Sequence, residues 1–255
     1  MAVPPEQPAA GRARPAARGL TVAGEVERYE PVTDEALRAP DPDDWLMIRG
    51  NYQAWSHTRL KEITPNNVAD LKLAWTWAMN EGGWNAPSPL VHDGVLYLPG
   101  YGNVVQALDA RTGDLIWEHQ VGAEGGGYSG QSRNLAIYND KVFLTTSDAR
   151  LFALAARTGQ ELWHTSLADS ANGFQSTSGP IVIGGKVIQG LNGCDRFTRA
   201  GCFISAYDSA TGHQLWTFNT VARSDEPGGN TWANLPDYLR GGGDTWITGS
   251  YDPGL

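Results

Sequence analysis

The chain has 255 residues and a formal net charge of −9 at pH 7, from 19 Lys and Arg against 28 Asp and Glu. This acidic balance excludes the basic surface on which nucleic-acid binding depends, and no apolar run reaches the roughly 18 residues of a membrane-spanning helix. With 31 Gly, 15 Pro and 10 Trp and little helical periodicity, the composition predicts an all-β protein rich in turns.

Residues 1–40 are rich in Pro, Ala and charged side chains and poor in aromatic ones. Because such a segment can bury little apolar surface, we expect it to be disordered or loosely attached to a folded domain that covers residues 41–255. It contains Arg12, Arg14 and Arg18 but lacks the apolar stretch of a secretory signal. We therefore expect no export signal in the chain as given.

The stretch most favourable to a helix is residues 63–72. Thr64 can cap such a helix, and Pro65 suits its first position. The residues that follow, 73–77, have the sequence Leu-Ala-Trp-Thr-Trp, which predicts a strand.

One sequence motif, the repeated phrase, occurs three times, at residues 107–117, 153–163 and 206–216. Each copy contains Thr-Gly and ends with a tryptophan four residues after the glycine. These tryptophans, Trp117, Trp163 and Trp216, are 46 and 53 residues apart, close to the period of a four-stranded propeller blade. A single structural unit is therefore used repeatedly.

The motif contains residues that favour a turn. Thr-Gly between two apolar strands predicts a hairpin in which glycine adopts a positive φ. The tryptophan after each turn would fill the space between neighbouring sheets and bury on the order of 150–250 Å². Short strands around the copies predict three blades in meander order, over residues 89–119, 133–166 and 178–219, and a fourth group that starts near residue 244.

The predicted fold is thus a β-propeller of four-stranded antiparallel blades, about three to four of them, and incomplete, because propellers have roughly four to eight blades. We expect either part of a longer gene product or a chain that is completed by a second copy or a partner.

Cys194 and Cys202 lie in one loop between two predicted strands. A local disulfide would require an oxidising compartment, and the alternative is a pair of reduced thiols in a cytosolic protein. The sequence has no Cys-Xaa-Xaa-Cys-His motif, which excludes covalent haem attachment.

The order of the repeats, together with the glycine-rich segments before Trp232 and Trp246, resembles the quinoprotein alcohol and methanol dehydrogenases, which depend on pyrroloquinoline quinone (PQQ). The resemblance runs from about Trp45 to Leu255. It implies the N-terminal part of an eight-bladed propeller with PQQ and a metal ion, calcium or a lanthanide, near its axis. It also implies oxidation of a small alcohol, electron transfer to a cytochrome c or a quinone, and a periplasmic location.

The resemblance assigns residues to the cofactor. Arg133 matches an arginine directed at oxygens of the quinone, and a guanidinium suits planar anionic groups. Thr177 matches a threonine that bonds a cofactor carboxylate. Trp246 matches the tryptophan that lies beneath the tricyclic ring, where stacking fixes the plane of the ligand.

The turn formed by Asn192, Gly193, Cys194 and Asp195 matches one that contacts the quinone and supplies a metal ligand. Asp195 would be that ligand, because a hard cation prefers carboxylate oxygens. The family has the longer glutamate at this position.

Several positions depart from the family pattern. Ala86 stands where a glutamate bonds the quinone and offers no hydrogen bond, while Gly127 and Tyr128 replace the adjacent cysteines of some members. Asp244 replaces a Thr or Ala after three glycines, where its carboxylate could join the metal site or repel the carboxylates of the cofactor.

The family's asparagine metal ligand and the aspartate that accepts the alcohol proton correspond to positions beyond Leu255. We therefore expect residues 1–255 alone to be inactive. The alternatives are a non-enzymatic propeller scaffold of the same superfamily, like the outer-membrane assembly lipoproteins, or a truncated product without function.

Overall fold

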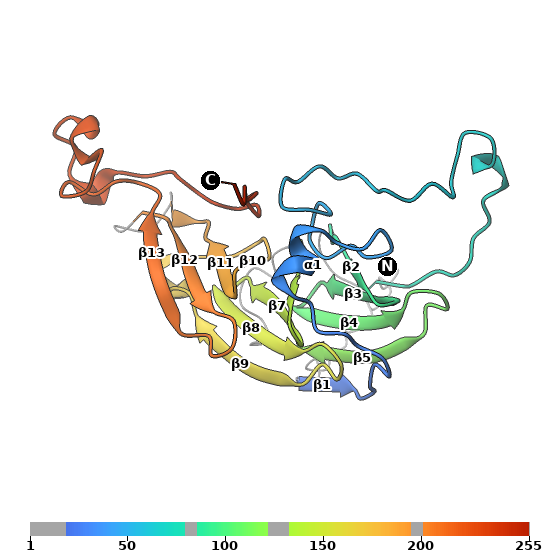
Figure 1. Ribbon diagram of the computed structural model, residues 1–255. Helices are drawn as coiled ribbons and strands as arrows, with labels where there is room; N and C mark the ends of the chain where they lie inside the picture. The colour runs from blue at the N-terminus through green and yellow to red at the C-terminus, as the bar shows by residue number, and fades with distance from the viewer. Residues whose placement is uncertain (1–18, 80–85, 122–132, 195–200, 255) are drawn as a thin grey trace, which may run out of the picture.

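Figure 1 shows the computed structural model, which describes residues 19–79, 86–121, 133–194 and 201–254. Its strands form three antiparallel sheets that follow one another along the chain. The strands are β1 (Gly19–Val22), β2 (Leu90–His92), β3 (Val95–Gly100), β4 (Val104–Asp109), β5 (Leu115–Gln120), β6 (Ala136–Tyr138), β7 (Lys141–Thr146), β8 (Arg150–Ala155), β9 (Glu161–Ser166), β10 (Ile181–Ile183), β11 (Lys186–Gly190), β12 (Phe203–Asp208) and β13 (Gln214–Asn219). The prediction of an all-β partial propeller is confirmed.

Each sheet is a meander. The strand orders are β1-β5-β4-β3-β2, β6-β7-β8-β9 and β10-β11-β12-β13. Helical elements are few and short: α1 (Asp34–Arg38) and the 3₁₀ helices η1 (Val68–Asp70), η2 (Ser170–Asn172), η3 (Gly229–Trp232) and η4 (Asp237–Leu239). Within the part of the chain that the structure describes, no helix has the length and apolar character to cross a membrane.

Residues of the repeated phrase form the contact between neighbouring blades, in which a tryptophan of one blade packs on a glycine of the next. We call this contact the joint. Gly159 has a φ of +68°, and a Cβ atom placed on it would lie 2.4 Å from Cε3 of Trp117. The indole of Trp117 therefore lies directly against the glycine, and its Nε1 donates a hydrogen bond to the carbonyl of Ala156 at 3.0 Å. Only glycine permits both this backbone conformation and this close approach.

The other blades use the same joint. A Cβ atom on Gly212 would lie 2.6 Å from Trp163, and one on Gly113 would lie 2.7 Å from Trp75. Trp75 thus performs for the first blade what the repeated tryptophans perform for the next two, although it lies outside the repeat. Trp216 is 41 % exposed, because no further blade follows it among the described residues.

Residues 63–77 differ from the prediction. Only η1 is helical there, and residues 73–77 belong to none of the three sheets. The side-chain Oδ1 of Asn67 accepts a hydrogen bond from the backbone N–H of Thr64 at 2.7 Å, which closes a local turn in place of a helix. The stretch around η1 extends away from the sheets (Figure 1), and a short helix without a packing partner is marginal in water.

The N-terminal prediction is wrong for residues 19–40 and untested for residues 1–18, which lie outside the described residues. β1 pairs with β5 as a fifth strand of the first sheet, and Val32 is fully buried. The side chain of Thr33 caps α1 by accepting a hydrogen bond from the N–H of Ala36. The prediction rested on the charged composition of the whole segment and missed the few apolar residues that attach it to the folded domain.

The predicted fourth group of strands is also wrong. Residues 244–253 form no strand. Instead, Thr245 binds Leu191 and the hydroxyl of Thr248 binds Gly179, both beside the third blade. Thr248 also binds Asn134 beside the second blade, so this segment crosses the ends of both. The backbone N–H of Thr245 donates to the carbonyl of Leu191 beside the third blade instead of to a strand of a new sheet.

His92 makes the stability of the fold depend on pH. Its Nδ1 lies 3.0 Å from Oδ2 of Asp44 and its Nε2 lies 2.7 Å from the carbonyl of Glu30, so both ring nitrogens donate when the ring is charged. Burial lowers the pKa of His92, but the hydrogen bonds to Asp44 and Glu30 outweigh that effect, and the pKa lies above its ordinary value of 6.5.

Because the folded state binds this proton more tightly than the unfolded chain, the stabilisation is fully present below a pH of about 6.5 and is lost as the pH rises through the raised pKa. We expect urea unfolding to give a free energy of unfolding that falls over this range. His92→Gln should flatten the profile, whereas the exposed control His213→Gln should keep it. A wild-type profile that stays level above pH 6.5 would contradict this prediction.

Candidate functional site

Three segments that are distant in the sequence bring Arg133, Thr177 and Trp246 together. Arg133 precedes β6, Thr177 precedes β10, and Trp246 follows the glycine-rich stretch 241–243. Nη1 of Arg133 donates a hydrogen bond to the carbonyl of Thr177 at 2.8 Å, and its Cζ lies 5.2 Å from the centroid of the Trp246 ring. The indole is 51 % exposed, so a large part of this aromatic surface is open to a ligand.

Beneath these residues lies a buried hydrogen-bonded node. Oδ1 of Asn134 accepts from the N–H of Gly179 at 2.8 Å and lies 3.0 Å from the hydroxyl of Thr248, which is 2.8 Å from the carbonyl of Gly179. Each member is one or two residues from Arg133, Thr177 or Trp246. The node therefore fixes the three segments that carry them.

A second polar network holds the segment that carries Thr177. The hydroxyl of Ser176 donates to Oγ1 of Thr145 at 3.0 Å, and Nε2 of Gln189 donates to Ser176 Oγ at 3.0 Å. Ser176, Thr145 and Gln189 are buried, whereas Thr177 is half-buried. Its own hydroxyl makes no hydrogen bond to another residue of the described part of the chain, which leaves a donor available to a ligand.

The predicted cofactor turn has a well-defined backbone. Asn192 exchanges two backbone hydrogen bonds with Gln175, at 2.9 and 3.0 Å. Gly193 has a φ of +83°, and a Cβ atom there would lie 2.3 Å from the carbonyl oxygen of Gly173. Among the described residues, Oδ1 of Asn192 is buried without a hydrogen-bond partner. Asp195, the predicted metal ligand, lies outside the described residues.

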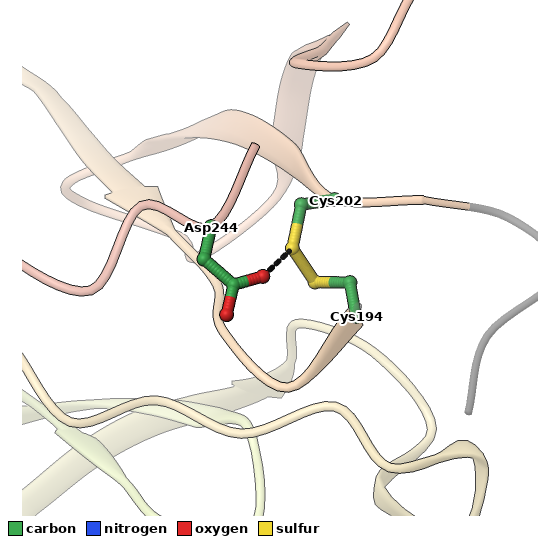
Figure 2. A group of neighbouring side chains, drawn as sticks. All are labelled: Cys194, Cys202 and Asp244. Atoms are coloured by element: carbon green, nitrogen blue, oxygen red, sulfur yellow. Dashed lines mark hydrogen bonds between the residues drawn. A yellow bond between two sulfur atoms is a disulfide. The ribbon is translucent and has the colours of Figure 1, made fainter. Parts of the chain in front are cut away.

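Cys194 and Cys202 form a disulfide with their Cα atoms 5.2 Å apart, which settles the choice left open by the sequence (Figure 2). Both cysteines are buried, and Cys194 places one end of the bridge in the predicted turn. A carboxylate oxygen of Asp244 and the two sulfur atoms all lie within 4.8 Å of one another. Because the sulfurs are bonded to each other, they offer no thiolate to a metal ion.

A profile of the PQQ family, described as the beta-propeller domain of glucose, ethanol and alcohol dehydrogenases, matches residues 45–255. The chain belongs to the PQQ-dependent alcohol dehydrogenase family. It is 33 % identical over 231 residues to the quinohemoprotein alcohol dehydrogenase ADH-IIG of Pseudomonas putida, with 84 % of this chain and 32 % of that protein covered.

Other members give the same result. A lanthanide-dependent methanol dehydrogenase of Methylacidiphilum fumariolicum is 30 % identical over 249 residues, with 87 % of this chain and 40 % of that protein covered. The solved structure of ADHIIG from Pseudomonas putida superposes with a TM-score of 0.76 at 30 % identity, covering 89 % of this chain and 36 % of that one. A europium-containing methanol dehydrogenase superposes with a TM-score of 0.78 at 28 % identity, covering 86 % and 42 %.

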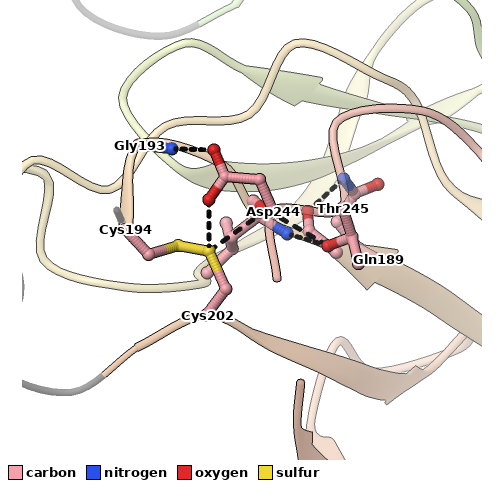
Figure 3. Close-up of a disulfide and its surroundings, with 8 residues drawn as sticks. Gln189, Gly193, Cys194, Cys202, Asp244 and Thr245 are labelled. Carbon is pink, nitrogen blue, oxygen red and sulfur yellow. Dashed lines mark hydrogen bonds between the residues drawn. A yellow bond between two sulfur atoms is a disulfide. The ribbon is translucent and has the colours of Figure 1, made fainter. Parts of the chain in front are cut away.

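This PQQ-family chain spans about a third of the length of the first of these relatives. Of the positions that depart from the family pattern, Ala86 is exposed, whereas Gly127 and Tyr128 lie outside the described residues. The carboxylate of Asp244 is engaged: Oδ2 accepts a hydrogen bond from the N–H of Gly193 at 3.2 Å, and Oδ1 lies 2.9 Å from Sγ of Cys202 (Figure 3). Neither contact was foreseen from the sequence.

Proposed function

We propose that this chain is the N-terminal, quinone-binding part of a PQQ-dependent dehydrogenase. Such an enzyme would oxidise a small alcohol in the periplasm and pass the electrons to a cytochrome c or a quinone. The observation that carries the proposal is the position of the Arg133 guanidinium, which contacts both the carbonyl of Thr177 and the open indole of Trp246. Membership of the PQQ family supports it.

The residues fit a planar, anionic, aromatic ligand. The exposed indole of Trp246 offers a stacking surface, the guanidinium of Arg133 offers several N–H donors in one plane, and the hydroxyl of Thr177 offers a further donor. We assign these three residues to the quinone, together with the turn Asn192, Gly193 and Cys194. When bound, PQQ supplies the electron-accepting group for alcohol oxidation.

For the metal ion we propose calcium or a lanthanide, held by the carboxylate of Asp195. A hard cation prefers oxygen ligands, and Oδ1 of Asn192, which has no hydrogen-bond partner among the described residues, is a carbonyl oxygen in the same turn. Two relatives are named for a lanthanide or for europium, which makes the choice of metal a matter for experiment.

The residue that accepts the alcohol proton in the family has no counterpart assigned within residues 1–255. We therefore propose that these residues alone bind the quinone without turning over alcohol. Binding and turnover can be measured separately, so this part of the proposal has its own test.

The quinone site is tested by adding PQQ with calcium or a lanthanide ion and measuring quinone absorbance after gel filtration. We expect the wild-type chain to retain PQQ. Arg133→Lys should bind about tenfold more weakly, because an ammonium group cannot reproduce the planar fork of donors. Arg157→Lys, which alters a surface ion pair with Glu25, is the matched control and should bind normally. No retained absorbance, or equal affinity of Arg133→Lys, would refute the assignment.

A further inference from the structure

Asp244 joins two parts of the proposed quinone site (Figure 3). It lies two residues before Trp246, and its Oδ2 accepts the hydrogen bond from the N–H of Gly193 at 3.2 Å. Its Oδ1 lies 2.9 Å from Sγ of Cys202. This second contact is not a hydrogen bond while Cys202 remains in the disulfide, because that sulfur carries no proton. The carboxylate thus attaches the glycine-rich segment to Gly193, the residue before the disulfide-bonded Cys194.

Thr245 supplies a second attachment next to the first. Its backbone N–H donates to the carbonyl of Leu191 at 2.8 Å, and its Oγ1 accepts from the N–H of Leu191 at 2.8 Å. A Cβ atom on Gly190 would lie 1.9 Å from Oγ1 of Thr245, so the two segments are in direct contact. Asp244 and Thr245 therefore hold residues 190–193 at consecutive points.

The position of Trp246 depends on these attachments. Half of its side chain is exposed, so packing alone does not hold it. On its N-terminal side, Gly242 and Gly243 have φ values of +89° and +72° and carry no side chain that could fix the backbone. Asp244 is the first residue after these glycines whose side chain binds another segment.

The same carboxylate stands beside the disulfide. Reduction begins when a thiolate attacks one sulfur of the bridge, and the other cysteine leaves as a thiolate. Cys194 and Cys202 are 1 % and 0 % exposed, so a reductant can reach either sulfur only after the structure around the bridge opens. An attacking thiolate would also meet the negative charge of Asp244.

We propose that Asp244 is a positioning residue that holds the glycine-rich segment against Gly193 beside the disulfide, sets Trp246 relative to the turn at residues 192–194, and protects the disulfide from reduction. Its effect on the cofactor rests on the proposed function, because it requires that PQQ stacks on Trp246. Its effect on the disulfide is independent of any ligand.

The ligand-free test measures the rate at which dithiothreitol reduces the disulfide. Two thiols of the reagent are oxidised to its cyclic disulfide as Cys194 and Cys202 become thiols. We expect Asp244→Ala to be reduced about tenfold faster than wild type, because Gly193 next to the bridge loses a charge-assisted hydrogen bond and the bridge loses the repelling charge beside it. The exposed control Asp252→Ala removes the same charge from the same segment and should leave the rate unchanged. Equal rates for Asp244→Ala and wild type would overturn the proposal.

Asp244→Asn keeps an oxygen that can accept from the N–H of Gly193 and loses the charge, so its rate should fall between the two. It also carries the test if Asp244→Ala does not fold, and a wild-type rate for it would then overturn the proposal. Amide hydrogen exchange provides a second ligand-free readout, and the N–H of Gly193 should exchange about tenfold faster in Asp244→Ala.

The final measurement is the dissociation constant for PQQ with calcium. Asp244→Ala should bind about tenfold more weakly, with partial recovery in Asp244→Asn. Unchanged affinity in Asp244→Ala would overturn the positioning role. If the wild-type chain bound no PQQ, the proposed function would fail, and the reduction and exchange rates would still decide whether Asp244 holds Gly193 and shields the disulfide.

Discussion

Trp117→Ala is expected to lower the free energy of unfolding by about 3–5 kcal/mol, the range for removing a large buried aromatic side chain. Trp117 is fully buried, lies against Gly159 of the second blade and packs near Tyr97, with ring centroids 6.0 Å apart. The alanine variant leaves a cavity at the joint between two blades. It also removes the hydrogen bond from Nε1 to the carbonyl of Ala156.

Trp216→Ala is the matched control, because it removes the same side chain at the same place in the repeat. Trp216 is 41 % exposed and has no following blade among the described residues. Its loss should change the free energy of unfolding by less than about 1 kcal/mol. Urea unfolding followed by circular dichroism measures both variants. Similar losses for the two would show that the joint between blades does not carry the stability assigned to it.

The repeated phrase allowed this joint to be predicted in part. Thr-Gly indicated a turn with a positive φ, and Gly113, Gly159 and Gly212 have that conformation. The following tryptophan indicated packing between sheets, as Trp117 shows. The sequence did not reveal that the glycine itself is the surface on which the tryptophan of the preceding blade lies, because the two residues belong to different copies of the repeat.

Trp75 shows the same limit of prediction from the repeated phrase. It occupies the joint in front of the first blade, where its Nε1 donates to the carbonyl of Ala110 at 3.1 Å. No Thr-Gly turn precedes it, so the repeat could not identify it. Its neighbours favour a strand by their local preferences, yet residues 73–77 pair with no sheet in the described structure. Local preference cannot form a strand without a partner.

The candidate site was predictable to a similar degree. Arg133, Thr177 and Trp246 were assigned by resemblance, and the structure brings them together. Asn134 and Thr248 could not be found in the same way, because a buried amide that accepts from a distant segment leaves no spacing pattern in one sequence. Asp244 was noticed as a departure, but its partners depend on where the disulfide places Gly193 and Cys202.

Gly179→Ala is expected to destabilise the protein by roughly 3 kcal/mol and to disrupt the quinone site as well. A Cβ atom on Gly179 would lie 1.9 Å from the carbonyl oxygen of Asn134 and 2.8 Å from its side-chain Nδ2. The first of these atoms belongs to the backbone and cannot rotate away. The methyl group must therefore push apart the segments that carry Arg133 and Thr177.

Gly249→Ala provides the control, because it adds the same methyl group one residue after Thr248, where no atom lies within 4 Å of the new Cβ. It should leave both stability and PQQ affinity close to wild type. Thermal unfolding and PQQ titration of the two variants test the prediction. A Gly179→Ala protein with wild-type stability would mean that the node of Asn134, Gly179 and Thr248 adapts easily. Site geometry would then depend less on the blades than on the attachments made by Asp244 and Thr245.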